Sequence, residues 1–253
     1  MEQNIIPSLL IALMVGIASG SIGAFVILRR MALVGDALSH VALPGIAIAL
    51  AYQIDPFWGV LTFLLGGAVI VWWLGEKTAL PAEALVGLLF TASLAIGILT
   101  IPDSEILESL FGIFPTMSPL ALGIFLAAAA LLTLFSFLFS KQFLFSIVSR
   151  DLSAVAGVGK YYDLGFFLIF ATAVALGIKL VGTLLMGALT IIPASVAKNF
   201  SQSMRGYMVL SAILGGLISV AGVFFAYQFA FLPGPSIILT GIILFIVSLF
   251  FRR

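Results

Sequence analysis

Long runs of hydrophobic residues dominate the chain, and short polar interruptions separate them. Each run is close to the ~20 apolar residues that an α-helix needs to cross the hydrocarbon core of a bilayer. The sixth and seventh runs are the shortest, and joining them into one broken helix would give eight spans. The nine candidate spans are residues 5–28, 31–52, 57–74, 81–101, 119–140, 163–178, 181–197, 206–228 and 235–251. The pattern predicts an all-α membrane protein, a polytopic bundle of eight to nine transmembrane helices.

The composition leaves little with which to build a surface that faces water. Of the 253 residues, 63% are hydrophobic and 8% are charged, and the mean hydropathy is +1.32, values typical of an integral membrane protein. No polar stretch is long enough for a soluble domain, so we expect residues 1–253 to form a single transmembrane domain. A net charge of +1 with no basic tract gives no argument for nucleic acid binding, and the absence of cysteine excludes thiolate metal sites.

The distribution of basic residues predicts the orientation. With the N-terminus outside, ten of the eleven lysines and arginines face the cytoplasm and only Lys179 lies outside, as the positive-inside rule favours. The ten are Arg29, Arg30, Lys77, Lys141, Arg150, Lys160, Lys198, Arg205, Arg252 and Arg253. Merging the sixth and seventh spans would instead reverse the N-terminal half.

Small residues recur inside several spans, where they would let helices approach closely. They are Gly16, Gly20 and Gly23 in the first span, Gly182 and Gly187 in the seventh, and Gly215, Gly216 and Gly222 in the eighth. Such residues are typical of interfaces between membrane helices, so we expect a tightly packed bundle.

The second span carries an acid and the only histidine of the chain, Asp36 and His40. Four residues apart on a helix, the two side chains lie one turn apart on the same face, where a carboxylate oxygen and an imidazole nitrogen can bind one metal ion. Ionisable groups at membrane depth are costly and usually functional. Pro44 removes the helix hydrogen bond to the carbonyl of His40, which favours a kink there. The alternative is an interfacial Asp36 that bonds only to His40.

The longest polar interruption is residues 141–163. By the charge rule it lies inside, and Ser149 or Asp151 could cap a short helix that ends at Gly157 or Gly159. Composition alone fits either a solvated loop between helices or a docking element for a cytoplasmic partner.

Four blocks of the sequence together resemble the membrane permeases of zinc and manganese ABC importers. The run from Phe25 to Gly45, with Gly35-Asp36 and His40 inside it, is similar to the signature of that family. The segments 110–112, 179–197 and 232–236 are similar to later motifs of the family and occur along the chain in the same order as in the family. The resemblance covers essentially the whole chain.

The resemblance implies a transport subunit without catalytic residues or a bound cofactor, in the plasma (inner) membrane. Its partners would be a second permease copy, two cytoplasmic ATPase subunits that bind ATP, and an extracytoplasmic metal-binding protein. Asp36 and His40 would contact the divalent metal, zinc or manganese, as transported substrate. The docking segment would include Ser149, Arg150, Asp151, Leu152, Ala156 and Gly157.

The number of metal ligands constrains this interpretation. One Asp and one His give two protein ligands, whereas zinc usually takes four and manganese up to six. A two-fold dimer axis beside the second span would duplicate the pair and supply two carboxylates and two imidazoles.

Two other functions fit less well. An intramembrane aspartyl protease would need Gly at position 33, which is Leu33, and a single histidine without a serine partner gives no Ser-His enzyme. An ATP-independent secondary metal transporter or channel is the stronger alternative. The chain has no phosphate-binding Gly-x-x-x-x-Gly-Lys-Ser/Thr loop, so any use of ATP requires another subunit.

Overall fold

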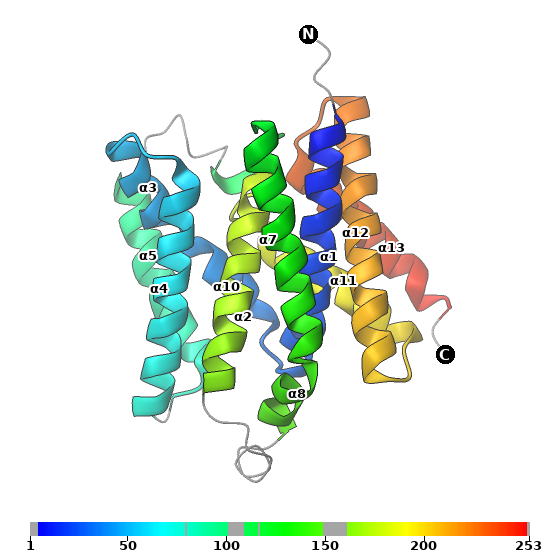
Figure 1. Ribbon diagram of the computed structural model, residues 1–253, viewed down its shortest axis with the longest axis horizontal. Helices are drawn as coiled ribbons and strands as arrows, with labels where there is room; N and C mark the ends of the chain where they lie inside the picture. The colour runs from blue at the N-terminus through cyan, green and yellow to red at the C-terminus, as the bar shows by residue number, and fades with distance from the viewer. Residues whose placement is uncertain (1–4, 79, 101–108, 116, 149–160, 252–253) are drawn as a thin grey trace.

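The computed structural model describes residues 5–78, 80–100, 109–115, 117–148 and 161–251, and within these ranges the regular structure is entirely helical. Most of the helices run between the two ends of the molecule (Figure 1). The helices are α1 (Ile6–Leu28), α2 (Ala32–His40), α3 (Leu43–Ala51), α4 (Pro56–Lys77), α5 (Ala82–Thr100), α7 (Pro119–Leu138), α8 (Ser140–Val148), α10 (Tyr161–Val181), α11 (Met186–Phe200), α12 (Met204–Phe229) and α13 (Pro233–Leu249).

Six helical segments are long and apolar enough to cross a membrane by length and composition: α1, α2 with α3, α4, α7, α10 and α12. Shorter apolar helices lie at Ala82–Gly97 and Pro233–Leu249. Many large apolar side chains point outward, among them Leu99 at 85% and Phe250 at 83% exposure. Such surfaces are expected where lipid replaces water. The prediction of a polytopic helical membrane bundle is confirmed.

Two boundaries differ from the expectation. The sixth span, expected at 163–178, extends as α10 to Val181, and the seventh begins at Met186 instead of 181. Gly182 ends α10 because its φ of +83° is a conformation that an L side chain rarely adopts. The turn that follows separates α10 from α11, so the two are not one broken helix. Helix α11 continues through Pro193 without interruption.

The described basic residues gather at one end of the bundle, which we call the basic end. Arg29, Arg30, Lys77, Lys141, Lys198 and Arg205 lie at the ends of α1, α4 and α11 or at the starts of α8 and α12. These helix ends point toward the lower end of the molecule in Figure 1. Lys179 lies at the other end, with its Nζ atom 3.8 Å from Asp55 Oδ2. The arrangement agrees with the asymmetry on which the predicted orientation depends.

Glycines set the spacing of the central helices. A Cβ atom on Gly16 would lie 2.2 Å from the carbonyl oxygen of Gly215, and one on Gly23 would lie 2.0 Å from that of Thr190. The first contact brings α1 against α12 and the second brings it against α11, so the backbones of these helices touch. The predicted tight packing through small residues is confirmed.

Candidate functional site

The second span is a broken helix, and the break follows His40 directly. Helix α2 ends at His40, two turn residues follow, and α3 starts at Leu43 with Pro44 in its first turn. Proline fits the first turn of a helix because its missing N–H has no partner there. The kink predicted from Pro44 is present, and it leaves α2 as a nine-residue helix packed between α5 and α11.

The structure places Asp36 and His40 on α2 but does not pair them. His40 is only 6% exposed, and its ring lies 5.3 Å from the ring of Phe90. Its buried Nδ1 atom has no hydrogen-bond partner among the described residues. The side chain of Asp36 is half-buried and makes no ion pair or hydrogen bond with any residue that the structure describes. The alternative of a closed Asp36–His40 pair is therefore not what the fold contains, and both groups keep free ligand atoms.

Close backbone contacts hold α2 in place. A Cβ atom on Gly187, at the start of α11, would lie 2.6 Å from the backbone nitrogen of Asp36. On the neighbouring residue, a Cβ atom on Gly35 would lie 3.3 Å from the ring of Phe170 in α10. The hydroxyl of Ser39, which is fully buried, donates a hydrogen bond to the main-chain carbonyl of Thr183.

The turn at Thr183 belongs to a junction of three distant segments. The backbone N–H and the hydroxyl of Thr183 both donate to the carbonyl of Ser109, at 2.9 and 3.1 Å. A Cβ atom on Gly112 would lie 2.4 Å from the carbonyl oxygen of Leu180, and one on Gly234 would lie 2.4 Å from that of Val181. Residues 109–112, 180–184 and 234 therefore meet here. Together with α2, these are the four sequence blocks on which the family resemblance was based.

A single copy offers too few ligands for a closed metal site. No group of three or more His, Asp or Glu side chains gathers within the described ranges. Asp36 and His40 thus supply one oxygen and one nitrogen from this chain. The remaining positions around a metal ion would have to come from water or from a second copy.

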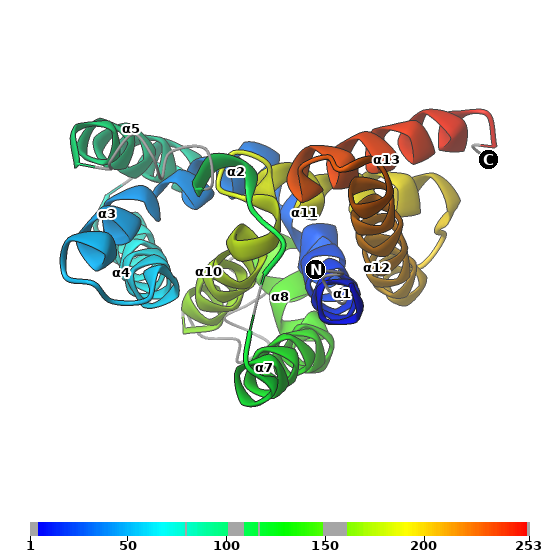
Figure 2. The same ribbon diagram turned by 90° about the horizontal axis from the view of Figure 1, so that it is seen from above.

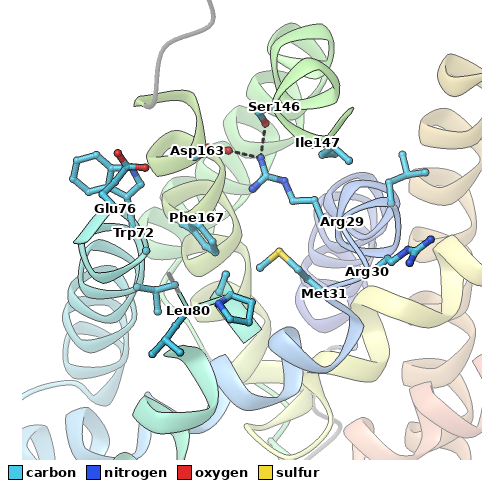
Figure 3. Close-up of a pocket in the computed structure, with 15 residues that line it drawn as sticks. Arg29, Arg30, Met31, Trp72, Glu76, Leu80, Ser146, Ile147, Asp163 and Phe167 are labelled. Carbon is cyan, nitrogen blue, oxygen red and sulfur yellow. Dashed lines mark hydrogen bonds and ion pairs between the residues drawn. The ribbon is translucent and has the colours of Figure 1, made fainter. Parts of the chain in front are cut away.

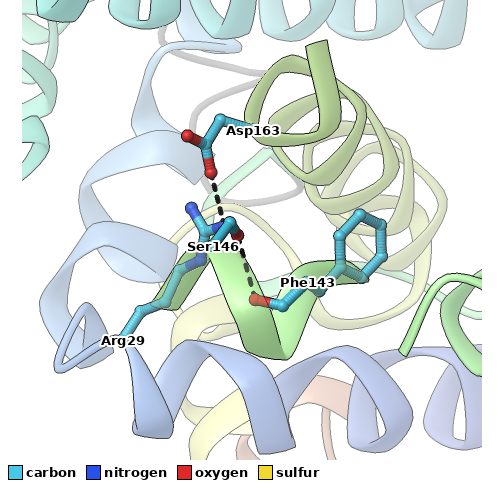
Figure 4. Close-up of polar contacts among 4 residues, drawn as sticks. All are labelled: Arg29, Phe143, Ser146 and Asp163. Carbon is cyan, nitrogen blue, oxygen red and sulfur yellow. Dashed lines mark hydrogen bonds and ion pairs between the residues drawn. The ribbon is translucent and has the colours of Figure 1, made fainter. Parts of the chain in front are cut away.

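The basic end contains a buried arginine, Arg29. The sequence indicated this residue only as one of the cytoplasmic charges. Arg29 follows α1, and its side chain is 10% exposed. Its Nη2 atom donates to Asp163 Oδ1 at 2.7 Å and to the hydroxyl of Ser146 at 2.6 Å (Figure 4). Its guanidinium lies 4.1 Å from the centre of the Phe166 ring. Burial lowers the pKa of the Arg29 guanidinium below its usual value, and the attraction of Asp163 offsets part of that shift. Arg29 joins α1, α8 and α10.

The same arginine lines a cavity of about 400 Å³ at the basic end (Figure 3). Charged side chains of both signs line it, together with aromatic and aliphatic ones. The lining includes Arg29, Arg30, Glu76, Asp163, Trp72 and Phe167. The mixed charge does not select one class of ligand. The predicted docking residues, Ser149, Arg150, Asp151, Leu152, Ala156 and Gly157, fall outside the described residues, between α8 and α10.

Comparison with known proteins identifies the family. Residues 1–252 match the model of the ABC 3 transport family. The manganese import system permease protein ScaB of Streptococcus gordonii is 32% identical over 248 residues, which cover 96% of this chain and 89% of that protein. The high-affinity zinc uptake system membrane protein ZnuB of Haemophilus influenzae is 31% identical over 267 residues, covering 100% of this chain and 99% of that protein.

The fold matches as well. A chain in the solved structure of PsaBC from Streptococcus pneumoniae in complex with Fab superposes with a TM-score of 0.86 at 29% identity, covering 100% of this chain and 93% of that one. The chain therefore belongs to the ABC 3 transport family, as the multi-pass membrane permease subunit, and not the ATPase, of an ABC-type manganese or zinc import system.

Proposed function

We propose that Asp36 and His40 bind the divalent metal ion on its way through the membrane. One observation carries the proposal: both side chains keep unpartnered ligand atoms on a broken helix, at the place where the four family-like segments meet. A buried imidazole nitrogen without a hydrogen-bond partner costs free energy in an apolar surrounding. A role as a transient ligand of the metal explains why this residue is a histidine.

The metal site is completed by a second copy of the chain. Helices α5, α2 and α13 lie along one long side of the molecule, with α2 near the middle of that side (Figure 2). Two copies that face each other across this side would bring two Asp36 carboxylates and two His40 imidazoles to one two-fold axis. Four nitrogen and oxygen ligands without sulfur fit zinc, and with added water they fit manganese.

The membrane domain as a whole and its contacts with the other subunits of the importer belong to the same proposal. Residues 1–253 form one transmembrane domain in which nine segments cross the membrane, with α2 and α3 together as the second. Two ATPase subunits dock at the basic end on the segment with Ser149, Arg150, Asp151, Leu152, Ala156 and Gly157, and an extracytoplasmic protein delivers metal at the opposite end. Since family membership assigns ATP hydrolysis to a separate subunit, the ATP-independent carrier considered from the sequence has no support.

The cargo is zinc or manganese. One relative is named for manganese and another for zinc at nearly the same identity, 32% and 31%, so identity does not favour either metal. The proposed ligand set of carboxylates and imidazoles suits both ions.

Metal-binding stoichiometry tests the shared site. The purified permease with its ATPase subunits is equilibrated with radioactive zinc and, separately, manganese. One ion for every two permease chains is expected, and Asp36→Asn and His40→Ala should each remove binding while the complex stays assembled. One ion per chain, or parental binding by both variants, would contradict the proposal.

A further inference from the structure

Ser39 occupies the turn of α2 between the two proposed metal ligands. Its side chain is fully buried, and its hydroxyl contacts two carbonyl oxygens, that of Asp36 at 2.7 Å within α2 and that of Thr183, 144 residues away. The first contact stays inside the helix. The second is a polar link from α2 to the rest of the bundle.

The Thr183 carbonyl belongs to a fixed part of the structure. Thr183 donates two hydrogen bonds to the carbonyl of Ser109, and Leu184 donates a third to that of Leu110. Gly182, whose own φ is positive, lies directly against the backbone of residues 110–112. The Ser39 hydroxyl thus binds α2 to a fixed backbone carbonyl. An acceptor on a flexible side chain would not restrain α2 in this way.

The close contacts that hold α2 in place do not define its rotation about its own axis by a directional bond. Helix α2 has nine residues, no side chain caps its N-terminus, and it breaks after His40. Its contacts with α5, α10 and α11 include the rings of Phe90 and Phe170 and the glycine backbone at Gly187, and such apolar contacts are not directional. A hydrogen bond has a defined geometry, so the bond from Ser39 restricts the rotation of α2 that these contacts leave free.

We propose that Ser39 is a positioning residue: its hydrogen bond to the Thr183 carbonyl sets the direction in which Asp36 and His40 present their ligand atoms, and thereby the relative affinity of the site for zinc and manganese. Zinc demands tetrahedral ligands at short distances, whereas manganese accepts more ligands and added water. A rotated α2 therefore weakens zinc binding more than manganese binding. The inference rests on the proposed metal site.

The test measures binding of radioactive zinc to the assembled permease–ATPase complex, with manganese as competitor. Ser39→Ala removes the hydrogen bond. The loss of one hydrogen bond should weaken zinc binding by about tenfold and lower the ratio of zinc affinity to manganese affinity. Ser39→Cys keeps a weak donor of similar size and should fall between the parent and Ser39→Ala.

Ser211→Ala is the matched control. Ser211 is also fully buried, and its hydroxyl donates at 2.5 Å to the carbonyl of Gly20, so it joins α12 to α1 and not to α2. This variant should lower the melting temperature as much as Ser39→Ala does, with the parental metal preference. A parental preference in Ser39→Ala, or the same change of preference in Ser211→Ala, would overturn the inference.

Asp36→Asn and His40→Ala in the same assay separate the two proposals. If both variants lose zinc while Ser39→Ala keeps the parental preference, the positioning role fails and the metal site stands. If both variants bind zinc as the parent does, the metal site fails, and the role of Ser39 fails with it.

Discussion

Gly182 and Gly112 show how single residues hold the junction beside the proposed site. Both have positive φ angles, of +83° and +72°, and a Cβ atom on Gly182 would lie 2.2 Å from the carbonyl oxygen of Leu110. Because this carbonyl oxygen belongs to the backbone, it cannot rotate away. The junction therefore needs glycine for both conformation and space.

Gly182→Ala should destabilise the permease by about 2 kcal/mol or more, since a left-handed backbone alone costs about 1–2 kcal/mol for an L side chain. Melting of the detergent-purified protein measures the loss. Gly66→Ala is the control: Gly66 lies within α4, an added Cβ would meet nothing within 4 Å, and alanine favours a helix. Equal melting temperatures for the two variants would contradict the role of the junction.

At the residue scale, the local part of the site could be predicted from the sequence. Asp36 and His40 share a helix face because helical periodicity depends only on neighbours, and Pro44 indicated the break after His40. The missing Asp36–His40 bond and the contact between Ser39 and Thr183 could not be predicted. They depend on segments that come together only when the bundle packs.

At the element scale, hydrophobic run length located the helices but not all of their ends. The apolar composition continues past Val181, so the length of the hydrophobic run did not indicate that α10 extends to that residue and that α11 starts at Met186. The junction with residues 109–112 sets that boundary. Arg29 is a similar case, because its partner Asp163 lies 134 residues away and no pattern links the two.

Arg29→Gln and Asp163→Asn should each lower the free energy of unfolding by about 2 kcal/mol, since each leaves the other partner without its counter-charge. The expected loss is smaller than for a fully buried ion pair because the Asp163 side chain is 33% exposed and solvent screens its charge. The double variant should lose less than the sum of the two. Melting temperatures of the purified permease report both effects.

Lys179→Gln provides the contrast. It breaks the ion pair of Lys179 with Asp55, which is longer, at 3.8 Å, and more exposed. We expect a change below about 0.5 kcal/mol. A loss as large as that of Arg29→Gln, or strict additivity in the Arg29 and Asp163 double variant, would argue against the buried arginine as a link between α1, α8 and α10.

At the scale of the whole molecule, the single-end distribution of basic residues predicts which loops face the cytoplasm. The chain has no cysteine, so introduced cysteines report accessibility without background. Ser153→Cys should react with an impermeant reagent only from the cytoplasmic side, and bound ATPase should slow the reaction. Gln53→Cys, in the exposed turn between α3 and α4, should react from outside at a rate that ATPase does not change. Labelling of Ser153→Cys from outside would reverse the orientation and remove the docking proposal.

The central claim is that Asp36 and His40 carry the metal through the membrane. Uptake of zinc and manganese by proteoliposomes that contain the importer with its ATPase and binding protein tests it most directly. Asp36→Asn and His40→Ala should abolish ATP-driven uptake while the subunits remain assembled, and uptake by the parent should fall as the pH drops, because a protonated imidazole does not bind metal. Glu83→Gln, which removes an exposed carboxylate in the first turn of α5, should transport at the parental rate. Parental uptake by His40→Ala would contradict the account.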